Sequence, residues 1–405
     1  MRRKIFISIF VAVLSLGQTL TAQSSRDSLD YYYNLKEFEH DFYALQYGRM
    51  NDDAGQGQKW YKRFCIFHVT DVHGCNDLLH DAVTVARGKA DVVVGTGDDA
   101  SGVAVRDSLH VRTKLDEAAS TVMAASKGEI PYMSVPGNHD VAGIRKEDFF
   151  NRIDSMIGKL CPGVVWGDPE GCRSYGYADF EGGAPNGSFR IILLDPFDYD
   201  DREFGTTRTF MTATFSQKQV DWLVSTLRDA AAKGLHVITA MHYSFGDNSL
   251  PFTEELAKPD AVFYQDPFMI PDIIDAIQHK KVLKATYRDE KGKQNIRVNE
   301  DFRDVADLDY VCHLFGHIHS RNEYRCQKTD GSKEYDILMI GEASLSTMGT
   351  ALNKIIRTQG TLNEIQFSAL LIDTVEKNIY RVGYGAGTTY NLSDSGRLSK
   401  ISYKF

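Results

Sequence analysis

Five apolar runs of this 405-residue chain each stop at a short polar motif, and this pattern constrains the fold more than any other feature. The first run ends in Thr70-Asp71-Val72-His73-Gly74. Side chains two positions apart on a strand point the same way, so Asp71 and His73 can hold one ion at its carboxyl end. Gly74 then lets the chain turn sharply. The motif therefore predicts a metal-binding strand end.

The other four runs end in motifs of the same kind. They are Gly97-Asp98-Asp99, Gly137-Asn138-His139-Asp140, the single His242, and Gly316-His317-Ile318-His319. Strand and helix patterns alternate along the first part of the chain, which predicts a mainly parallel sheet with helices outside. Ligands of such sheets bind beyond the carboxyl ends of the strands, where all five motifs lie. We therefore expect the motifs to form one site.

The same patterning predicts individual elements. We expect strands at 64–70, 91–95, 131–135 and 190–194, helices near 76–88 and 106–127, and a helix that begins after an N-cap at Ser216. The insertion at 244–308 carries a charged, helix-like tract at 272–284. Segments 366–374 and 378–384 predict a β-hairpin, which we expect at the far edge of a second sheet.

Asp-x-His, Gly-Asp, Gly-Asn-His-Asp, a lone His and Gly-His-x-His occur in this order over roughly residues 61 to 345. In this order they resemble the calcineurin-like metallophosphoesterase superfamily. The resemblance implies an α/β fold, a four-layer α/β/β/α sandwich of two mixed sheets flanked by helices, with a dinuclear metal site at strand carboxyl ends. It also implies hydrolysis of phosphomono- or phosphodiesters by attack of a hydroxide that bridges the two metals.

The resemblance further implies which residues bind the two divalent ions, for which Mn²⁺, Zn²⁺, Fe²⁺ and Mg²⁺ stay open. One ion would be held by Asp71, His73, Asp98 and His319, and the other by Asp98, Asn138, His242 and His317, with Asp98 as the bridge. Phosphate oxygens carry negative charge, which two close cations neutralise while they lower the pKa of a bridging water. Such ions require hard oxygen and nitrogen ligands, which this set supplies.

His139 follows a ligand directly, and the resemblance makes it the group that meets the leaving oxygen, as a general acid or as a cation. Family members with Gly-Asp-x-x-Asp orient this histidine with the second Asp, but Ser101 occupies that place here. Asp140 or Asp99 could substitute. The expected catalytic set is His139, Asp98 and Asp140. His68 and His313 lie within apolar runs, and we expect both to be buried, hydrogen-bonded histidines.

Two departures from family patterns narrow the class. Ser101 stands where purple acid phosphatases carry a Tyr, and the Asp-Arg-Gly of Ser/Thr protein phosphatases is missing. With these two classes excluded, the expected function is that of a phosphoesterase acting on small molecules, nucleotides or lipid head groups. The alternative is a catalytically silent, exported binding module stabilised by metal. The complete ligand set, with His139 present, favours the enzyme.

The chain begins with Met1-Arg2-Arg3-Lys4, an apolar segment and Thr21-Ala22, a pattern typical of a signal peptide at 1–22. A retained N-terminal anchor is the alternative. We therefore expect a secreted or periplasmic protein with no integral membrane segment after cleavage. Cleavage would remove three basic residues and no acid, taking the formal net charge from −9 to −12. Such a charge disfavours nucleic acid as an obligate partner, and a small-molecule phosphate ester is the expected one.

We expect residues 23–60 to be an N-terminal helical extension and linker, the linker at 51–58. Residues 61–405 would then form the metallophosphoesterase domain, with insertions near 141–190 and 244–308. The mature chain keeps six cysteines. Cys161 and Cys172 are the expected disulfide pair, if one forms, because they flank one Pro/Gly-rich loop. Cys65 and Cys312 lie within strands and are expected to be buried thiols.

Overall fold

The computed structural model describes residues 29–51, 57–101, 108–141, 156–171, 173–198, 212–213, 215–246, 263–264, 267–288, 295–328, 330–346, 364–386 and 398–404. The predicted signal peptide at 1–22 lies outside these residues. Among the described residues, no helix combines the length and the apolar character needed to cross a bilayer.

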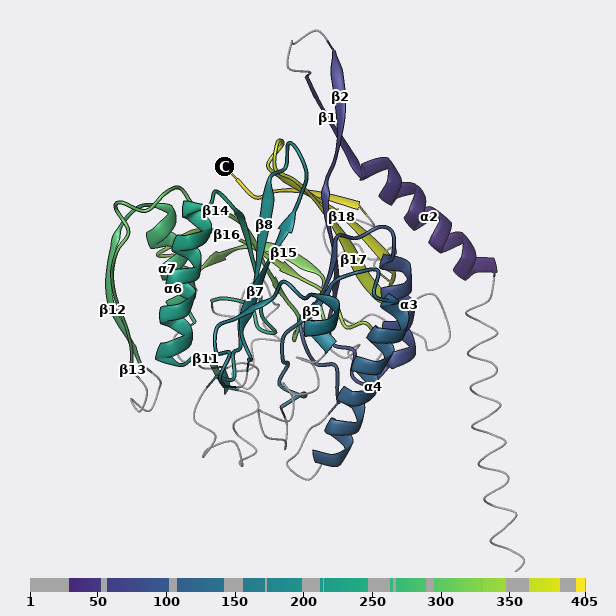
Figure 1. Ribbon diagram of the computed structural model, residues 1–405, viewed down its shortest axis with the longest axis horizontal. Coiled ribbons are helices and arrows are strands. Elements are labelled where there is room, and N and C mark those ends of the chain that lie inside the picture. The colour runs from purple at the N-terminus through teal and green to yellow at the C-terminus, as the bar shows by residue number, and fades with distance from the viewer. Residues whose placement is uncertain are drawn as a thin grey trace, which may run out of the picture.

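Two mixed sheets stack at the centre of the molecule (Figure 1). The first has the strand order β19-β18-β17-β3-β4-β5 and the second β15-β16-β14-β10-β8-β7-β6. The strands of the first are β3 (Phe64–Val69), β4 (Val92–Gly95), β5 (Tyr132–Ser134), β17 (Gln366–Asp373), β18 (Asn378–Gly385) and β19 (Leu398–Ser402). Those of the second are β6 (Val165–Trp166), β7 (Gly176–Glu181), β8 (Ser188–Leu193), β10 (His236–Ala240), β14 (Asp309–Phe315), β15 (Asn322–Gln327) and β16 (Glu334–Gly341).

Each sheet has a parallel centre. Strands β3, β4 and β5 are parallel, as are β8, β10, β14 and β16, while the outer strands pair antiparallel. Strand β3 is buried along its whole length, as expected for a central strand covered on both faces. The parallel strands of each sheet therefore end at a common edge, and the five motifs follow those ends.

Helices cover the outer faces. Figure 1 shows α2 (Leu29–Leu45), α3 (Asn76–Ala86) and α4 (Ser108–Ser126) beside the first sheet, and α6 (Gln217–Ala232) and α7 (Met269–Gln278) beside the second. The Ser216 hydroxyl caps α6 by accepting a hydrogen bond from the backbone N–H of Gln219, as expected for an N-cap serine. The layers run helix, sheet, sheet, helix, which confirms the expected four-layer fold.

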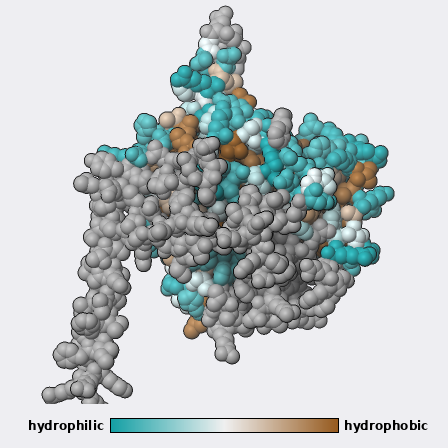
Figure 2. Space-filling model, turned by 180° about the vertical axis from the view of Figure 1, so that it is seen from behind, coloured by the Kyte–Doolittle hydropathy of each residue, from teal (hydrophilic) through white to brown (hydrophobic). Residues whose placement is uncertain are grey.

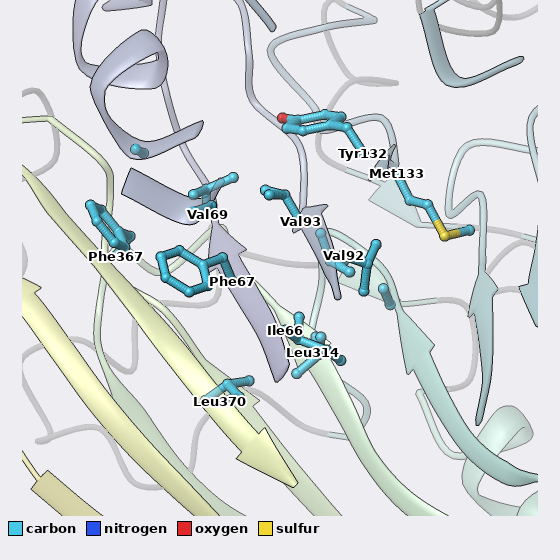
Figure 3. Close-up of a cluster of buried hydrophobic side chains, with 14 of the residues drawn as sticks. Ile66, Phe67, Val69, Val92, Val93, Tyr132, Met133, Leu314, Phe367 and Leu370 are labelled. Carbon is cyan, nitrogen blue, oxygen red and sulfur yellow. The ribbon is translucent and has the colours of Figure 1, made fainter. Parts of the chain in front are cut away.

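Apolar side chains fill the space between and around the sheets. The rings of Phe64 on β3 and Phe189 on β8 stack with centroids 4.1 Å apart, which joins the two sheets directly. Figure 3 shows Ile66 of β3 close to Leu314 of β14, with Phe67 turned toward Phe367 of β17. This packing fixes the relative positions of the strand ends that carry the motifs.

One buried ionic group also ties the sheets together. Arg381 of β18 donates to Glu342 at 2.7 Å and to Glu323 of β15 at 2.7 Å, and to the carbonyl of Gly341 at 2.8 Å. Burial opposes the ionisation of Glu342, but the Arg381 guanidinium lowers its pKa to about 2. Removing either partner would leave a buried charge uncompensated, which is strongly destabilising.

Several expectations from the sequence need correction. The predicted hairpin forms as β17 and β18, but β17 pairs with β3, so the hairpin lies within the first sheet, and β19 forms its edge. The helix-like tract at 272–284 is divided, because α7 ends at Gln278 and the strand β12 (Val282–Arg288) follows. The alternating exposure of β12 is that of a strand with one solvent face.

Three short strand pairs lie outside the two sheets. The expected linker at 51–58 joins β1 (Tyr47–Asn51) to β2 (Gln58–Lys62), an antiparallel hairpin; residues 52–56 lie outside the described part. Figure 2 shows this hairpin standing clear of the body. Strand β12 pairs with β13 (Asn295–Asp301), and β9 (Thr212–Ala213) pairs with β11 (Phe263–Tyr264).

No disulfide joins any two cysteines of the described residues. Cys65 and Cys312 are completely buried, as expected from their place in strands. Cys161 is also buried, and its expected partner Cys172 lies outside the described residues. A Cys161–Cys172 disulfide therefore stays a prediction.

The predicted N-terminal helix is α2, and we expect it to contribute strongly to stability through Phe38. The Phe38 ring is fully buried and contacts the rings of Phe67, Phe367 and Tyr384. Phe38→Ala should lower the free energy of unfolding by about 3–5 kcal/mol in urea titrations, because it opens a cavity. Tyr43 of the same helix is 51% exposed, and Tyr43→Ala should cost less than about 1 kcal/mol. Equal costs would contradict this anchoring role.

Candidate metal centre

Five of the motif residues adopt a backbone conformation that is uncommon for residues with a side chain. Among them, φ is 51° at Asp71, 50° at His73, 58° at Asp98, 68° at His317 and 52° at His319. A positive φ at a non-glycine residue costs roughly 1–3 kcal/mol and concentrates at functional sites, where the surrounding structure holds it. Here it turns each side chain inward just after its strand ends.

A first cluster joins the loops after β3, β4 and β14. Asp71, His73, Asp98 and His319 offer ligand atoms that all lie within 4.8 Å of one another. His319 Nε2 lies 3.0 Å from Asp71 Oδ1 and 3.1 Å from His73 Nε2. Imidazole nitrogens converging on carboxylate oxygens form a donor set suited to a divalent transition metal. These are the four residues expected for one ion.

A second cluster shares Asp98 with the first. Asp98, His242 and His317 again offer ligand atoms within 4.8 Å. Asn138 completes this cluster, since its Oδ1 lies 3.0 Å from His242 Nε2 and 3.0 Å from His317 Nδ1. The structure therefore brings all seven expected ligands together, and Asp98 alone belongs to both clusters of titratable residues.

Two buried carboxylate oxygens test whether metal ions fit. Asp71 Oδ1 and Asp98 Oδ2 accept no hydrogen bond within the described part of the chain. The other oxygen of Asp71 accepts from the Thr70 hydroxyl at 2.8 Å and from the His317 backbone N–H at 3.0 Å. The other oxygen of Asp98 accepts from the His139 N–H at 2.8 Å. A buried charged oxygen is costly unless paired, so the donor set fits cations.

The same contacts restrict how Asp98 can bridge. Its Oδ1 is engaged by the His139 amide, whereas Oδ2 lies 3.3 Å from His242 Nε2 and 3.9 Å from His139 Nε2. Oδ2 therefore lies closest to the second cluster through His242 and accepts no hydrogen bond in the described part of the chain. Burial opposes ionisation of Asp98, but His242 and His139 hold its pKa well below the ordinary value. Burial likewise opposes ionisation of Asp71, and His319 lowers that pKa to about 2.

Residues around the ligands fix their orientation. The carbonyl of Thr96 accepts a hydrogen bond from His242 Nδ1 at 2.7 Å, which leaves Nε2 facing the cluster. Ser344 Oγ donates to the carbonyl of Asp71 at 2.7 Å. Hydrogen bonds of this kind set the tautomer and ring orientation of metal-binding histidines. The sequence did not indicate that Thr96 and Ser344 orient the ligand residues. Thr70 and Thr96 lie next to motifs in the sequence, but their hydrogen-bond partners become evident only in the folded structure.

Asp140 contacts backbone amides rather than the ligand atoms. Its carboxylate accepts from the N–H groups of Asp98 at 2.7 Å, Ala100 at 2.7 Å and Gly137 at 2.9 Å. It therefore joins the loop after β4 to the loop after β5, and its expected catalytic part stays a prediction. Asp99 is also buried, and burial together with the charge of Asp98 raises its pKa to about 7.

His139 differs from the ligands in its exposure. Its side chain is 25% exposed, compared with 16% for His319, 6% for His73 and none for His242. The ring packs edge to face against His73 with centroids 5.0 Å apart. His139 thus lies at the open side of the cluster, where an incoming molecule can reach it.

His68 and His313 are buried and lie outside both clusters, as expected. His68 Nε2 lies 3.0 Å from Thr96 Oγ1, and His313 contacts Thr239 Oγ1 at 2.8 Å and the carbonyl of Tyr243 at 2.9 Å. Burial lowers the pKa of His68 to about 4 and that of His313 to about 3, so both are neutral near pH 7.

One known protein family has a sequence model that matches this chain. The model of the family described as calcineurin-like phosphoesterase matches residues 65–321. No curated protein matches the sequence.

Similar solved structures share little sequence with this chain. One, a protein of Thermus thermophilus, is 9% identical, with a TM-score of 0.39, covering 85% of this chain and 100% of its own. A conserved uncharacterized protein of Streptococcus pneumoniae, described as a predicted phosphoesterase, is 13% identical, with a TM-score of 0.30. The match covers 84% of this chain and 98% of that protein's chain. Phosphopantetheinyl hydrolase of Mycobacterium tuberculosis is 12% identical, with a TM-score of 0.34. The match covers 70% of this chain and 90% of that protein's chain.

We predict that Asp98→Ala abolishes binding of both metal ions, because only Asp98 belongs to both clusters. Elemental analysis of the purified protein, loaded with Mn²⁺ or Zn²⁺ and desalted, measures this. Asp99→Asn is the matched control: it alters the adjacent buried carboxyl, which lies outside both clusters, and should keep both ions. One ion retained at full occupancy in Asp98→Ala would rule out the bridge.

Proposed function

The chain belongs to the calcineurin-like phosphoesterase family, and on that premise we propose that it is a secreted enzyme hydrolysing phosphomono- or phosphodiesters of small molecules. It is a metallophosphoesterase, and its metal-dependent hydrolysis of phosphoesters follows from the family. Two parts of this function are proposals. One is that the substrate is a small molecule, a nucleotide or a lipid head group, and the other is that the chain is exported.

The observation that carries the proposal is the pair of clusters sharing Asp98, with two buried carboxylate oxygens that accept no hydrogen bond in the described part of the chain and lie close to imidazole nitrogens. Two divalent ions held there would neutralise the phosphate oxygens and make water a nucleophile near neutral pH. The chain itself orients the ligands through Thr96, Thr70 and Ser344. Asn138 adds a ligand without adding negative charge, which keeps the site attractive to an anionic substrate.

His139 supports a catalytic role over a silent binding module. A binding module needs the ligands but has no use for a partly exposed imidazole beside them. The backbone of His139 is fixed by the hydrogen bond from its N–H to Asp98 Oδ1, while its ring faces the open side. From there Nε2 can donate a proton to the leaving oxygen of an ester or stabilise its developing charge.

We predict that His139→Asn slows hydrolysis by about 10²- to 10⁴-fold while metal content stays nearly unchanged. The loss should be larger for alkyl esters than for nitrophenyl esters, because a poor leaving group requires the proton. Steady-state kinetics with both ester types measures this. Equal slowing of both esters with metals intact would make His139 a charge stabiliser instead of a general acid.

His242→Asn provides the contrast for that experiment. His242 is a fully buried member of the second cluster, so the change should lower metal occupancy and slow both esters alike. Loss of metal from His139→Asn as well would instead assign His139 as a ligand. No hydrolysis of any mono- or diester by the metal-loaded protein would favour the silent binding module.

Export is proposed from the order of basic, apolar and small residues at 1–22. We predict cleavage near Ala22-Gln23 and release into a secreted or periplasmic space. Intact-mass spectrometry of the protein recovered from that space measures the N-terminus. Retention of Met1 in the exported protein would favour an anchor over a cleaved signal peptide.

A further inference from the structure

The hairpin of β12 and β13 carries a surface cavity apart from the metal centre. The cavity has a volume of about 310 Å³ and is lined by Thr286, Arg288, Asn295 and Arg297. In the antiparallel register Thr286 lies opposite Arg297, and Arg288 opposite Asn295. All four are exposed and share one face of the hairpin. Arg288 and Arg297 are therefore diagonal neighbours on one face of the hairpin, beside Thr286 and Asn295.

This grouping of charge is unfavourable unless an anion joins it. Two like charges on neighbouring strands repel each other. Among the described residues, no carboxylate forms an ion pair with Arg288 or Arg297, and the nearby acids Glu300 and Asp301 pair with Arg228 and Arg303. The connecting segment 289–294 contains two acids and two lysines, so its sequence adds no net charge. In a chain of net charge −9, two neighbouring arginines that have no ion pair among the described residues are a distinct feature.

The backbone under the cavity is held rigidly. The side-chain amide of Gln217 bonds both backbone groups of Arg297: Oε1 accepts from its N–H at 2.8 Å, and Nε2 donates to its carbonyl at 2.9 Å. On the opposite face of the hairpin, Tyr287, Ile296 and Val298 are buried among apolar side chains of α6, α7 and the second sheet. The arginines therefore project from a fixed platform, and binding would cost little backbone ordering.

The cavity lies toward the same end of the second sheet as the metal ligands. Helix α6 ends just before β10 begins, so its first residue, Gln217, lies toward the carboxyl end of β10, which His242 follows. Gln217 contacts Arg297 directly. Figure 1 shows the hairpin as the outermost element beside α6 and α7. An anion bound there would lie toward the same end of β10 as His242.

We propose that Arg288 and Arg297, with Thr286 and Asn295, form an accessory binding site for a phosphate group. Guanidinium groups bind phosphate through paired, charge-assisted hydrogen bonds, and the hydroxyl and amide supply further donors. The bound group belongs either to a substrate that carries a second phosphate or to free phosphate. Only the first of these sources rests on the proposed function.

Calorimetric titration of the metal-loaded full chain with inorganic phosphate tests the site. The wild-type protein should show a binding event, separate from the metal centre, that weakens as salt increases. Arg288→Gln and Arg297→Gln should each weaken this event about tenfold or more, because each removes charge-assisted hydrogen bonds. Lys284→Gln is the matched control. Lys284 lies on the same face of the hairpin but outside the cavity, and the substitution likewise removes one positive charge. It should change the affinity less than about threefold.

Kinetics then distinguishes the two sources. If a second phosphate of the substrate binds here, the arginine variants should raise KM for a bisphosphate ester but not for nitrophenyl phosphate, with kcat unchanged. If free phosphate binds, both KM values should stay constant while the calorimetric event is lost. Unchanged phosphate binding in both arginine variants would overturn the proposal. An inactive protein would contradict the proposed function, yet the calorimetry would still test this site.

Discussion

The metal centre depends on a carboxylate that contacts backbone amides and none of the clustered ligand atoms. Asp140 accepts hydrogen bonds from the N–H groups of Asp98, Ala100 and Gly137, and so fastens the loops after two neighbouring strands. Burial and the charges of Asp99 and Asp98 raise the pKa of Asp140, and the hydrogen bonds from the N–H groups of Ala100 and Gly137 oppose that rise. Without this link the uncommon backbone angle at Asp98 would have less to hold it. The shared ligand of both clusters therefore depends on a neighbour that lies outside them.

The centre also balances its own charge in a way that links metal binding to protons. Burial lowers the pKa of His242, but Asp98 and Asp71 raise it to about 9, so His242 carries a proton near neutral pH when no cation is bound. A ligand imidazole must be deprotonated, so metal uptake at this cluster releases protons and becomes tighter as pH rises. The buried carboxylates thus have a positive partner in either state.

Much of the fold and most of the site could be predicted because the signals are local. Each apolar run that ends in a ligand motif is a strand with its own sequence pattern, and five such motifs in order define one edge of the sheets. The misplaced hairpin at 366–385 shows the limit: its own sequence predicts two strands but carries no signal that β17 pairs with β3, some 300 residues away. Thr96 and Arg381 were missed for the same reason, since their roles exist only through partners distant in sequence.

Gln217 protects the outer edge of a two-stranded sheet. The free edge of β13 is where another chain could add a strand, and such edges are a common route to aggregation. By bonding both backbone groups of Arg297, the side-chain amide of Gln217 acts as a single surrogate peptide unit at that edge. One residue of a neighbouring helix thus replaces a third strand. The hairpin can stay short and exposed at the periphery without becoming a template for assembly at this position.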